Sequence, residues 1–416
     1  MKRNLYLILT ILFCFNLVGC GNFKQNVKTI SNQEIKNEDN NSTIKENDVE
    51  LSNEPSTKPS IEPTTKPEPI IENYALSLIA VGDNLIHSPI YKKAKQTDGS
   101  YDFSSMYVNI KDTIQSYDLA IINQETIFVD DESNVSSYPC FGTPSSMGDT
   151  LVDVGFNVIL NATNHTLDKQ NIGFNDTIKF WKKYPETTIL GIHEDIEDFN
   201  TIDIVEKNGF KLAMFNYTYG LNGFTLPNGE EYKIDLLDNK EKFISDLQNI
   251  ENDVDFSICF LHIGTEYTYT PTDYQVDYIN DLIDAGADII ICSHPHVVEP
   301  YGEITTTKGN KGLVYYSCGN FISNQDKVDR ILGGMAEIYL TKTIIDGKVT
   351  NCDIEKYNFE PIVTHYNNKE HTIYKLDDYT NKLASTHTLK NKVSNFSIEY
   401  LRELWDKQHL YINSSN

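Results

Sequence analysis

Five short apolar segments recur along this sequence, and each ends close to a residue that can bind a metal ion. The segments have the length and hydrophobicity of buried β-strands. They span residues 76–82, 118–123, 157–161, 256–261 and 287–292. Segments with helical periodicity lie between them, at residues 104–115, 171–183, 240–250 and 272–285. Strands that alternate with helices of about 10 to 15 residues predict an α/β fold.

The pattern changes after residue 296. Shorter strand-like segments with polar turns follow, at residues 312–317, 334–340 and 348–363. They predict an antiparallel portion that closes the fold. We therefore expect one globular domain over residues 74–365 and a C-terminal appendage over residues 366–416, with weak helical periodicity at 397–405.

Polar side chains follow the five apolar segments where the strands should end. Ligands of open α/β sheets bind beyond the carboxyl ends of the strands, so we expect these side chains to converge in one cleft. The candidates are Asp83, Glu125, Asn164, His165, His262, His294 and His296.

Taken singly, most of these residues have an ordinary structural explanation. An aspartate can cap a helix, a glutamate can be a solvated surface acid, and a histidine can be a satisfied buried polar group. The pair His294 and His296 is harder to explain in this way, because alternate residues of an extended segment face the same side and Pro295 stiffens the link. The coincidence of five strand ends predicts a metal site.

The mixture of ligand types indicates which metals such a site would take. Carboxylate, amide and imidazole ligands without thiolates suit Mn, Fe, Zn or Co better than Mg or Ca. The sequence has no Cys-x-x-Cys motif. Seven candidate ligands exceed the needs of one tetrahedral ion, so we expect two divalent ions (Mn, Fe or Zn) bridged by a carboxylate.

The N-terminus has the pattern of an export signal. Lys2 and Arg3 precede an apolar segment, residues 5–18, which is short for a membrane span. Leu17-Val18-Gly19-Cys20 then resembles a bacterial lipobox. We expect a signal peptide over residues 1–19 and lipidation of Cys20, which would anchor the protein on the extracellular face of the cell membrane. An ordinary signal peptide and an uncleaved anchor are the alternatives.

Residues 20–73 have the composition of a disordered tether. They are rich in Asn, Ser, Thr, Glu and Lys, and prolines recur at every fourth position from Pro55 to Pro67. Such a segment cannot bury enough apolar surface to fold. The formal charge of the chain is −25, and most of it lies beyond the tether. This acidity argues against nucleic acid as a partner, because phosphate backbones require a basic surface.

Six motifs, in this order, resemble those of the CapA-type family, the poly-gamma-glutamate capsule biosynthesis family, which is related to metallo-dependent phosphatases. They are Ala80-Val81-Gly82-Asp83, Asn123-Gln124-Glu125, Asn161-Ala162-Thr163-Asn164-His165, His262-Ile263-Gly264-Thr265-Glu266-Tyr267, His294-Pro295-His296 and Ser317-Cys318-Gly319-Asn320. The resemblance covers about residues 75–325. It implies a metallophosphatase-like four-layer αββα sandwich with a metal site at the strand ends.

The resemblance also implies roles for individual residues. Metal ligation is implied for Asp83, Glu125, Asn164, His262, His294 and His296, with Glu125 bridging the two ions. His165 would be a general acid near the leaving group, and Asp168 would either orient it or cap the following helix. Substrate contacts are implied for Glu266, Tyr267 and Asn320, although the first two could also form a polar rim.

One departure from the related phosphatases concerns the first metal. Those proteins open with Asp-x-His, whereas here Asn84 follows Asp83 and the nearest histidine is His87. His87 could be a substitute ligand, a proton donor or neither.

Three hypotheses for the function follow. The first is biosynthesis, export or anchoring of an anionic surface polymer such as poly-gamma-glutamate, with membrane-bound synthase or export proteins as partners. The second is a metal-dependent hydrolase of the envelope, a phosphoesterase or an amidase. The third is a non-catalytic lipoprotein that binds a polymer. The lipobox and the tether favour an envelope substrate over a soluble nucleotide.

Overall fold

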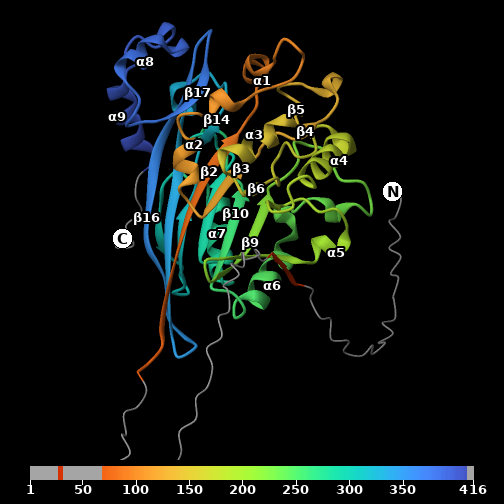
Figure 1. The fold of residues 1–416 in the computed structure, drawn as a ribbon, viewed down its shortest axis with the longest axis vertical. Helices are drawn as coiled ribbons and strands as arrows, with labels where there is room; N and C mark the ends of the chain where they lie inside the picture. Colours follow the sequence, from red (N-terminus) through yellow and green to blue (C-terminus); the bar gives the residue numbers. More distant parts are fainter. Residues whose placement is uncertain (1–26, 31–67, 410–416) are drawn as a thin grey trace, which may run out of the picture.

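The computed structural model describes residues 27–30 and 68–409 (Figure 1). The predicted signal peptide, the lipidation site at Cys20 and most of the predicted tether lie outside the described residues. A short strand, β1 (Val27–Ile30), falls within the tether segment. Among the helices of the described part, none is long and apolar enough to cross a membrane.

The first of two large sheets is built around four parallel strands. In spatial order these are β7 (Thr188–Leu190), β6 (Val158–Leu160), β3 (Leu119–Asn123) and β2 (Ile71–Asn84). Beyond β2 the sheet continues with the antiparallel strands β15 (Leu332–Ile345), β16 (Lys348–Tyr366) and β17 (His371–Lys375). A short strand, β14 (Asn320–Ile322), pairs in parallel with the end of β2. The parallel part and the antiparallel closing part confirm the predicted α/β fold.

The second sheet also has a parallel centre. It consists of β9 (Phe210–Thr218), β10 (Phe256–His262), β11 (Ile289–Ser293) and β13 (Lys311–Tyr315). Antiparallel strands flank this centre on both sides, namely β8 (Ile202–Lys207) next to β9 and β12 (Tyr301–Thr305) next to β13. β1 pairs in parallel with β8.

The two sheets pack face to face, and helices cover their outer faces. Successive side chains of a strand point to opposite sides, so Leu78 and Ala80 of β2 enter the core between the sheets while Ile79 and Val81 pack under helices. The helices over the first sheet are α1 (Ser88–Ala94), α2 (Lys111–Gln115), α3 (Ser146–Val154) and α4 (Gln170–Trp181). Those over the second sheet are α6 (Lys240–Ile250) and α7 (Asp273–Ile283). These layers confirm the four-layer αββα sandwich.

One predicted helix was wrong, and one hairpin was not predicted. Residues 104–115 form not one helix but a 3₁₀ turn, Ser104–Met106, followed by α2. The spacing of Met106, Ile110 and Ile114 is helical because all three side chains are buried on one side, although the backbone between the two elements is not a continuous helix. The pattern also fails to predict β8 and β9. These strands form a hairpin at Asn208-Gly209, both with positive φ, and Asn-Gly is a strong hairpin signal.

The C-terminal part extends the core between the sheets. β16 runs to Tyr366 and pairs with β17, after which α8 (Asn381–Thr386) and α9 (Ile398–Gln408) follow. In Figure 1 both helices lie at the end of the molecule where β17 is found. Leu401 and Trp405 of α9 belong to the same buried cluster as the inner faces of the two sheets. Residues 366–409 are therefore packed against the domain along much of their length.

Candidate metal centre

The carboxyl ends of six parallel strands meet at one edge of the sandwich. The first sheet contributes β2, β3 and β6, and the second contributes β9, β10 and β11. The end of β2 needs a glycine at position 82, because a Cβ there would lie 1.9 Å from the carbonyl oxygen of Gly319. This close approach places Asp83 beside β14, whose residues pair with the end of β2.

One group of candidate ligands joins the two sheets. The ligand atoms of Asp83, Glu125 and His296 all lie within 4.8 Å of one another, and all three residues are buried. Asp83 Oδ2 is 2.9 Å from His296 Nδ1, and Asn123 Nδ2 donates to Asp83 Oδ1 at 2.8 Å. Two carboxylates and an imidazole form a donor set that suits a divalent transition metal.

A second group lies on the other side of Glu125. His262 Nε2 is 3.0 Å from Asn164 Oδ1, and its Nδ1 is 3.1 Å from Ser293 Oγ. The ring of His294 lies 4.9 Å from that of His262 and 5.9 Å from that of His296. The structure thus brings all six predicted ligands together, although their role in binding metal stays a prediction.

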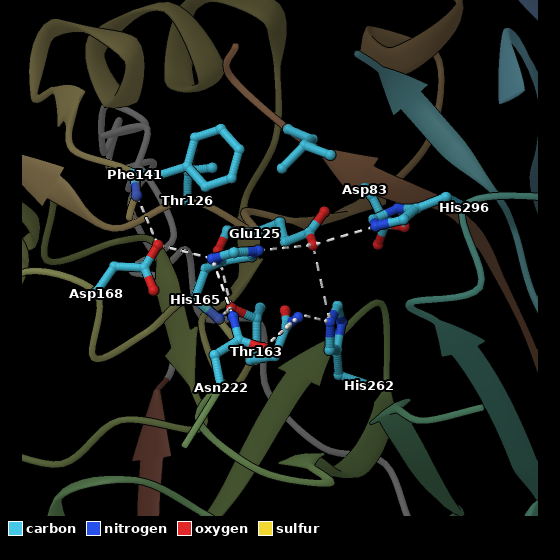
Figure 2. Close-up of polar contacts among 12 residues, drawn as sticks. Asp83, Glu125, Thr126, Phe141, Thr163, His165, Asp168, Asn222, His262 and His296 are labelled. Atoms are coloured by element: carbon cyan, nitrogen blue, oxygen red, sulfur yellow. Dashed lines mark hydrogen bonds and ion pairs between the residues drawn. The ribbon is translucent and has the colours of Figure 1, made fainter. Parts of the chain in front are cut away.

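Glu125 lies between the two groups and provides the test of whether these residues fit a cation. Its Oε1 is 3.8 Å from His296 Nε2 and 4.0 Å from both His262 Nε2 and His165 Nε2 (Figure 2). Within the described part of the chain, neither carboxylate oxygen forms a hydrogen bond, and both are buried. Burial raises the pKa of this carboxyl group well above its usual value. A buried carboxylate whose oxygens accept no hydrogen bond is unfavourable, so the site fits bound divalent cations.

The histidines differ in charge. Burial lowers the pKa of His294 to about 3 and the pKa of His262 well below its usual value, so both are neutral, as metal ligands must be. Burial also lowers the pKa of His296, but the nearby carboxylates of Glu125 and Asp83 outweigh this effect and raise the pKa to about 9. Both histidines of the His294-Pro295-His296 segment have positive φ, +102° and +59°, so the segment is a turn and the extended conformation predicted from the sequence is wrong. Such strained backbone is concentrated at functional sites.

His165 and Asp168 form a hydrogen-bonded pair at the edge of this centre. His165 Nδ1 is 2.7 Å from Asp168 Oδ2, which also accepts a hydrogen bond from the backbone N–H of Phe141 at 2.6 Å. The carboxylate can only accept, so the Nδ1 proton lies between the two residues and Nε2 faces Glu125. Asn222 Nδ2 is 3.2 Å from His165 Nδ1, and the Phe141 ring meets the imidazole edge to face (Figure 2). Asp168 thus contacts His165, while Lys169 occupies the N-cap of α4.

The remaining predicted residues lie on the rim. Glu266 is exposed, Tyr267 is half-buried with a φ of +66°, and their loop follows β10. Asn320 is buried, and its Nδ2 donates to three acceptors: His296 O, Gln325 Oε1 and Arg330 O. His87 Nδ1 is 3.2 Å from Leu85 O and 3.3 Å from the backbone nitrogen of Asn324. His87 is therefore engaged through Nδ1 with the backbone, and burial lowers its pKa to about 4.

Three residues at the site are not predicted from the sequence motifs: Tyr219, Asn222 and Arg330. Tyr219 directly follows β9, and its ring lies 4.6 Å from that of His294. The Asn208-Gly209 hairpin signal, had it been used to predict β9, would also have indicated Tyr219 as a residue at a strand end. No comparable signal marks Arg330, which reaches the site through a contact with Tyr267.

Comparison with known proteins gives a family. The model of the family described as bacterial capsule synthesis protein PGA_cap matches residues 77–325. The capsule biosynthesis protein CapA of Bacillus anthracis is 25% identical over 262 residues, which cover 61% of this chain and 61% of that protein. The PGA biosynthesis protein CapA of Bacillus subtilis is 30% identical over 176 residues, which cover 42% of this chain and 44% of that protein. The matched region therefore spans less than two thirds of either relative.

Solved structures with a similar arrangement include two nucleotidases. The NAD nucleotidase of Haemophilus influenzae aligns with a TM-score of 0.42 and 12% identity, over 81% of this chain and 60% of its own. A putative 5'-nucleotidase from Staphylococcus aureus aligns with a TM-score of 0.43 and 14% identity, over 80% of this chain and 58% of its own.

Proposed function

This chain belongs to the bacterial capsule synthesis family PGA_cap, and from that premise we propose that it takes part in the biosynthesis, export or anchoring of an anionic surface polymer, through a centre of two divalent metal ions. Poly-gamma-glutamate is the polymer we propose first, because one relative is named for its biosynthesis. The substrate, the partners and the number of ions are part of the proposal.

One observation carries the metal-dependent part: the two carboxylate oxygens of Glu125 are buried among three imidazoles and, among the described residues, accept no hydrogen bond. Asp83 and His296 would hold one ion, while Asn164, His262 and His294 would hold the other, with Glu125 shared between them. Divalent ions supply positive charge that polarises a carbonyl or phosphoryl oxygen and lowers the pKa of bound water.

The residues around the ions have their own tasks in this proposal. Asp168 accepts the Nδ1 proton of His165, which fixes the ring orientation and leaves Nε2 to hold or release a proton at the centre. Asn123 orients Asp83, and Ser293 orients His262, through the hydrogen bonds described above. This proton-handling pair favours a second candidate function, a metal-dependent envelope hydrolase that cleaves a phosphoester or an amide bond.

The proposed location is the extracellular face of the cell membrane. The lipobox-like pattern at Cys20 would provide a lipid anchor, and the tether would hold the domain away from the membrane. The chain has a formal charge of −25, which repels an anionic polymer. Bound divalent ions would reverse the sign of the charge locally and allow the polymer to approach.

Metal content is the first test. The full chain is purified in detergent, supplied with Mn, Fe or Zn and analysed by mass spectrometry for bound metal. We expect close to two ions per chain, and their loss in the double variant His262→Ala/His294→Ala. His365→Gln serves as the matched control, because His365 is fully buried elsewhere in the domain. A folded wild-type protein that binds no supplied metal would rule out this centre.

The polymer is tested in the bacterium that carries the gene. Deletion should abolish surface polyglutamate, and the wild-type gene should restore it, whereas Asp83→Asn and His296→Gln should not. If those variants restore the polymer fully, the protein acts as a polymer-binding lipoprotein without metal chemistry. If deletion leaves the polymer unchanged and cells lose a phosphoesterase or amidase activity instead, the envelope hydrolase is the better description.

A further inference from the structure

Arg330 lies beside the candidate metal centre with a positive charge that no described residue neutralises. Its guanidinium carbon lies 3.4 Å from the centre of the Tyr267 ring. Over residues 68–409, no carboxylate lies within 4.0 Å of its nitrogen atoms, and its buried Nε forms no hydrogen bond there. The other arginine of the folded part, Arg402, is paired with Asp377 at 3.3 Å. An unpaired guanidinium is unusual in a chain with 60 acidic residues and three arginines.

The acid next to Arg330 in sequence is already engaged. The hydroxyl of Tyr269 donates to Asp329 Oδ2 at 2.6 Å. Together with the stacking of Arg330 on Tyr267, this hydrogen bond joins the 3₁₀ turn Val328–Arg330 to the loop after β10. The guanidinium is therefore held at the rim by a contact with its face, while its charge is left for another partner.

Arg330 and Tyr267 are both tied to the turn that carries the candidate ligands. The backbone N–H of Tyr267 donates to Pro295 O at 2.8 Å, and its ring lies 5.9 Å from that of His296. Asn320 Nδ2 donates to Arg330 O at 2.9 Å and to His296 O at 3.3 Å. The backbone of Tyr267 has positive φ, a strained conformation that these contacts maintain. The ring of Tyr267 thus contacts the Arg330 guanidinium and lies near the His296 ring, which holds the guanidinium close to the turn.

We propose that Arg330 binds a negatively charged group of the substrate, a carboxylate or a phosphate, beside the group held at the metal centre. A guanidinium stacked on a ring through its face keeps the N–H groups at its edge available, and these match the two oxygens of a carboxylate or phosphate. The inference rests on the proposed function and narrows it, because the substrate must then carry an anionic group next to the one at the centre.

The test measures binding of two probes to the metal-loaded full chain by calorimetry. One probe is a γ-linked glutamate oligomer, and the other is inorganic phosphate. We expect Arg330→Gln to weaken binding of the anion that the site recognises at least about tenfold, as the loss of a charge-assisted hydrogen bond does. Metal content should not change. Arg330→Lys should give an intermediate loss, because the charge stays and the forked geometry is lost. Arg402→Gln is the control that should bind like the wild type.

The outcomes separate this proposal from the proposed function. Weaker binding of the oligomer by Arg330→Gln supports both, whereas weaker binding of phosphate alone supports Arg330 as an anion-binding residue and argues against the polyglutamate polymer. A wild-type chain that binds metal but neither probe overturns the inference. Equal affinity of Arg330→Gln and wild type for the bound probe also overturns it. Affinity that falls with ionic strength more steeply in wild type than in Arg330→Gln would separate a charge effect from a folding defect. If Arg330→Gln does not fold, the comparison of Arg330→Lys with wild type decides.

Discussion

The fold contains two groups of buried histidines that differ in what surrounds them. The strand-end histidines are His165, His262, His294 and His296. The C-terminal histidines are His365, His371 and His387, which lie on β16, on β17 and at the start of a 3₁₀ turn. The first group surrounds a buried carboxylate, whereas the second packs among tyrosines and backbone carbonyl groups. The comparison shows how a candidate binding site differs from histidines that are packed in a polar part of the core.

The C-terminal histidines have most of their polar atoms satisfied. His365 Nδ1 is 2.7 Å from the hydroxyl of Tyr379, His387 Nε2 is 3.2 Å from Thr364 O, and His371 Nε2 is 2.9 Å from Ser323 O. The acid nearest to this group, Glu370, has a side chain that is 45% exposed, so water solvates its charge. No cation is needed to compensate such a carboxylate. What distinguishes the candidate metal centre is therefore the fully buried Glu125, more than the number of histidines.

The largest effect is expected from a substitution at the carboxylate that the first group surrounds. Glu125→Gln should lower metal affinity at least about 100-fold, because it removes the shared ligand. Without metal the same variant should be more stable than the wild type, by on the order of 1–3 kcal/mol, since it removes a buried carboxyl group whose oxygens accept no hydrogen bond. Thermal melts would then show the wild type as the more stable protein with metal, and Glu125→Gln as the more stable protein in the presence of a chelator. A wild type that is more stable than Glu125→Gln under both conditions would contradict the interpretation of Glu125.

A smaller effect on metal binding is expected from a substitution in the second group. His365→Ala should destabilise the protein by about 2–4 kcal/mol, because it leaves a cavity and a tyrosine hydroxyl without its partner. Its metal content should equal that of the wild type. Urea unfolding and mass spectrometry on the same sample would check both points. Loss of metal together with stability would show that the two groups are not independent.

Acid should act on the C-terminal histidines through their burial. Burial lowers the pKa of His387 to about 4 and the pKa of His371 to about 3. Because these values lie below about 6.5, the value in the unfolded chain, the contribution to stability is fully present above about pH 6.5. It is lost as the pH falls from about 6.5 to about 4 for His387 and to about 3 for His371, at roughly 1.4 kcal/mol per pH unit for each histidine.

The variant His387→Gln isolates one of these titrations. Its melting temperature should fall less steeply than that of the wild type between pH 6.5 and pH 4, because one fewer proton is taken up on unfolding. His409→Gln, near the end of the described chain, is the control. Parallel pH profiles for His387→Gln and the wild type would mean that the buried ring of His387 does not stay neutral.

The smallest effect concerns a third arrangement, a histidine hydrogen-bonded to a carboxylate. His193 Nε2 is 2.8 Å from Asp235 Oδ2; burial lowers the pKa of His193, but Asp235 outweighs it and raises that pKa. The contribution of this pair is present below about pH 6.5 and is lost as the pH rises through the raised value. His193→Gln should therefore cost about 1 kcal/mol at pH 6 and less at pH 9, as chemical denaturation at the two pH values would show. A loss of stability in His193→Gln that grows with pH would contradict a raised pKa for His193.

The sequence predicts the strand ends well because the physical rule is local. A buried parallel strand appears as an apolar run, and the residue after it reaches the functional edge of the sheet, so Asp83, Glu125 and His262 can be selected without a structure. Tyr219 and Arg330 escape this rule for different reasons. Tyr219 matters because β9 pairs with β10, and Arg330 matters because it stacks on Tyr267 across 63 positions of the sequence.

The C-terminal histidines show what the sequence cannot predict. His365 and His387 bond to Tyr379 and to the backbone oxygen of Thr364, and neither partner has a sequence signature. A histidine that is satisfied in this way and a histidine that binds metal can occupy equally apolar surroundings. Only the position of a buried carboxylate among the rings distinguishes them, and that position depends on how the two sheets are placed.

The separation of Asp83 and His296 in the chain, 213 positions, has a consequence for how the protein is made. At the usual rate of protein synthesis, about 5–20 residues per second, His296 is added roughly 10 to 40 s after Asp83. Before then, no arrangement of the growing chain contains both residues. A metal ion that needs both residues therefore cannot bind until His296 has been made, and the two ligands it would join come from different sheets.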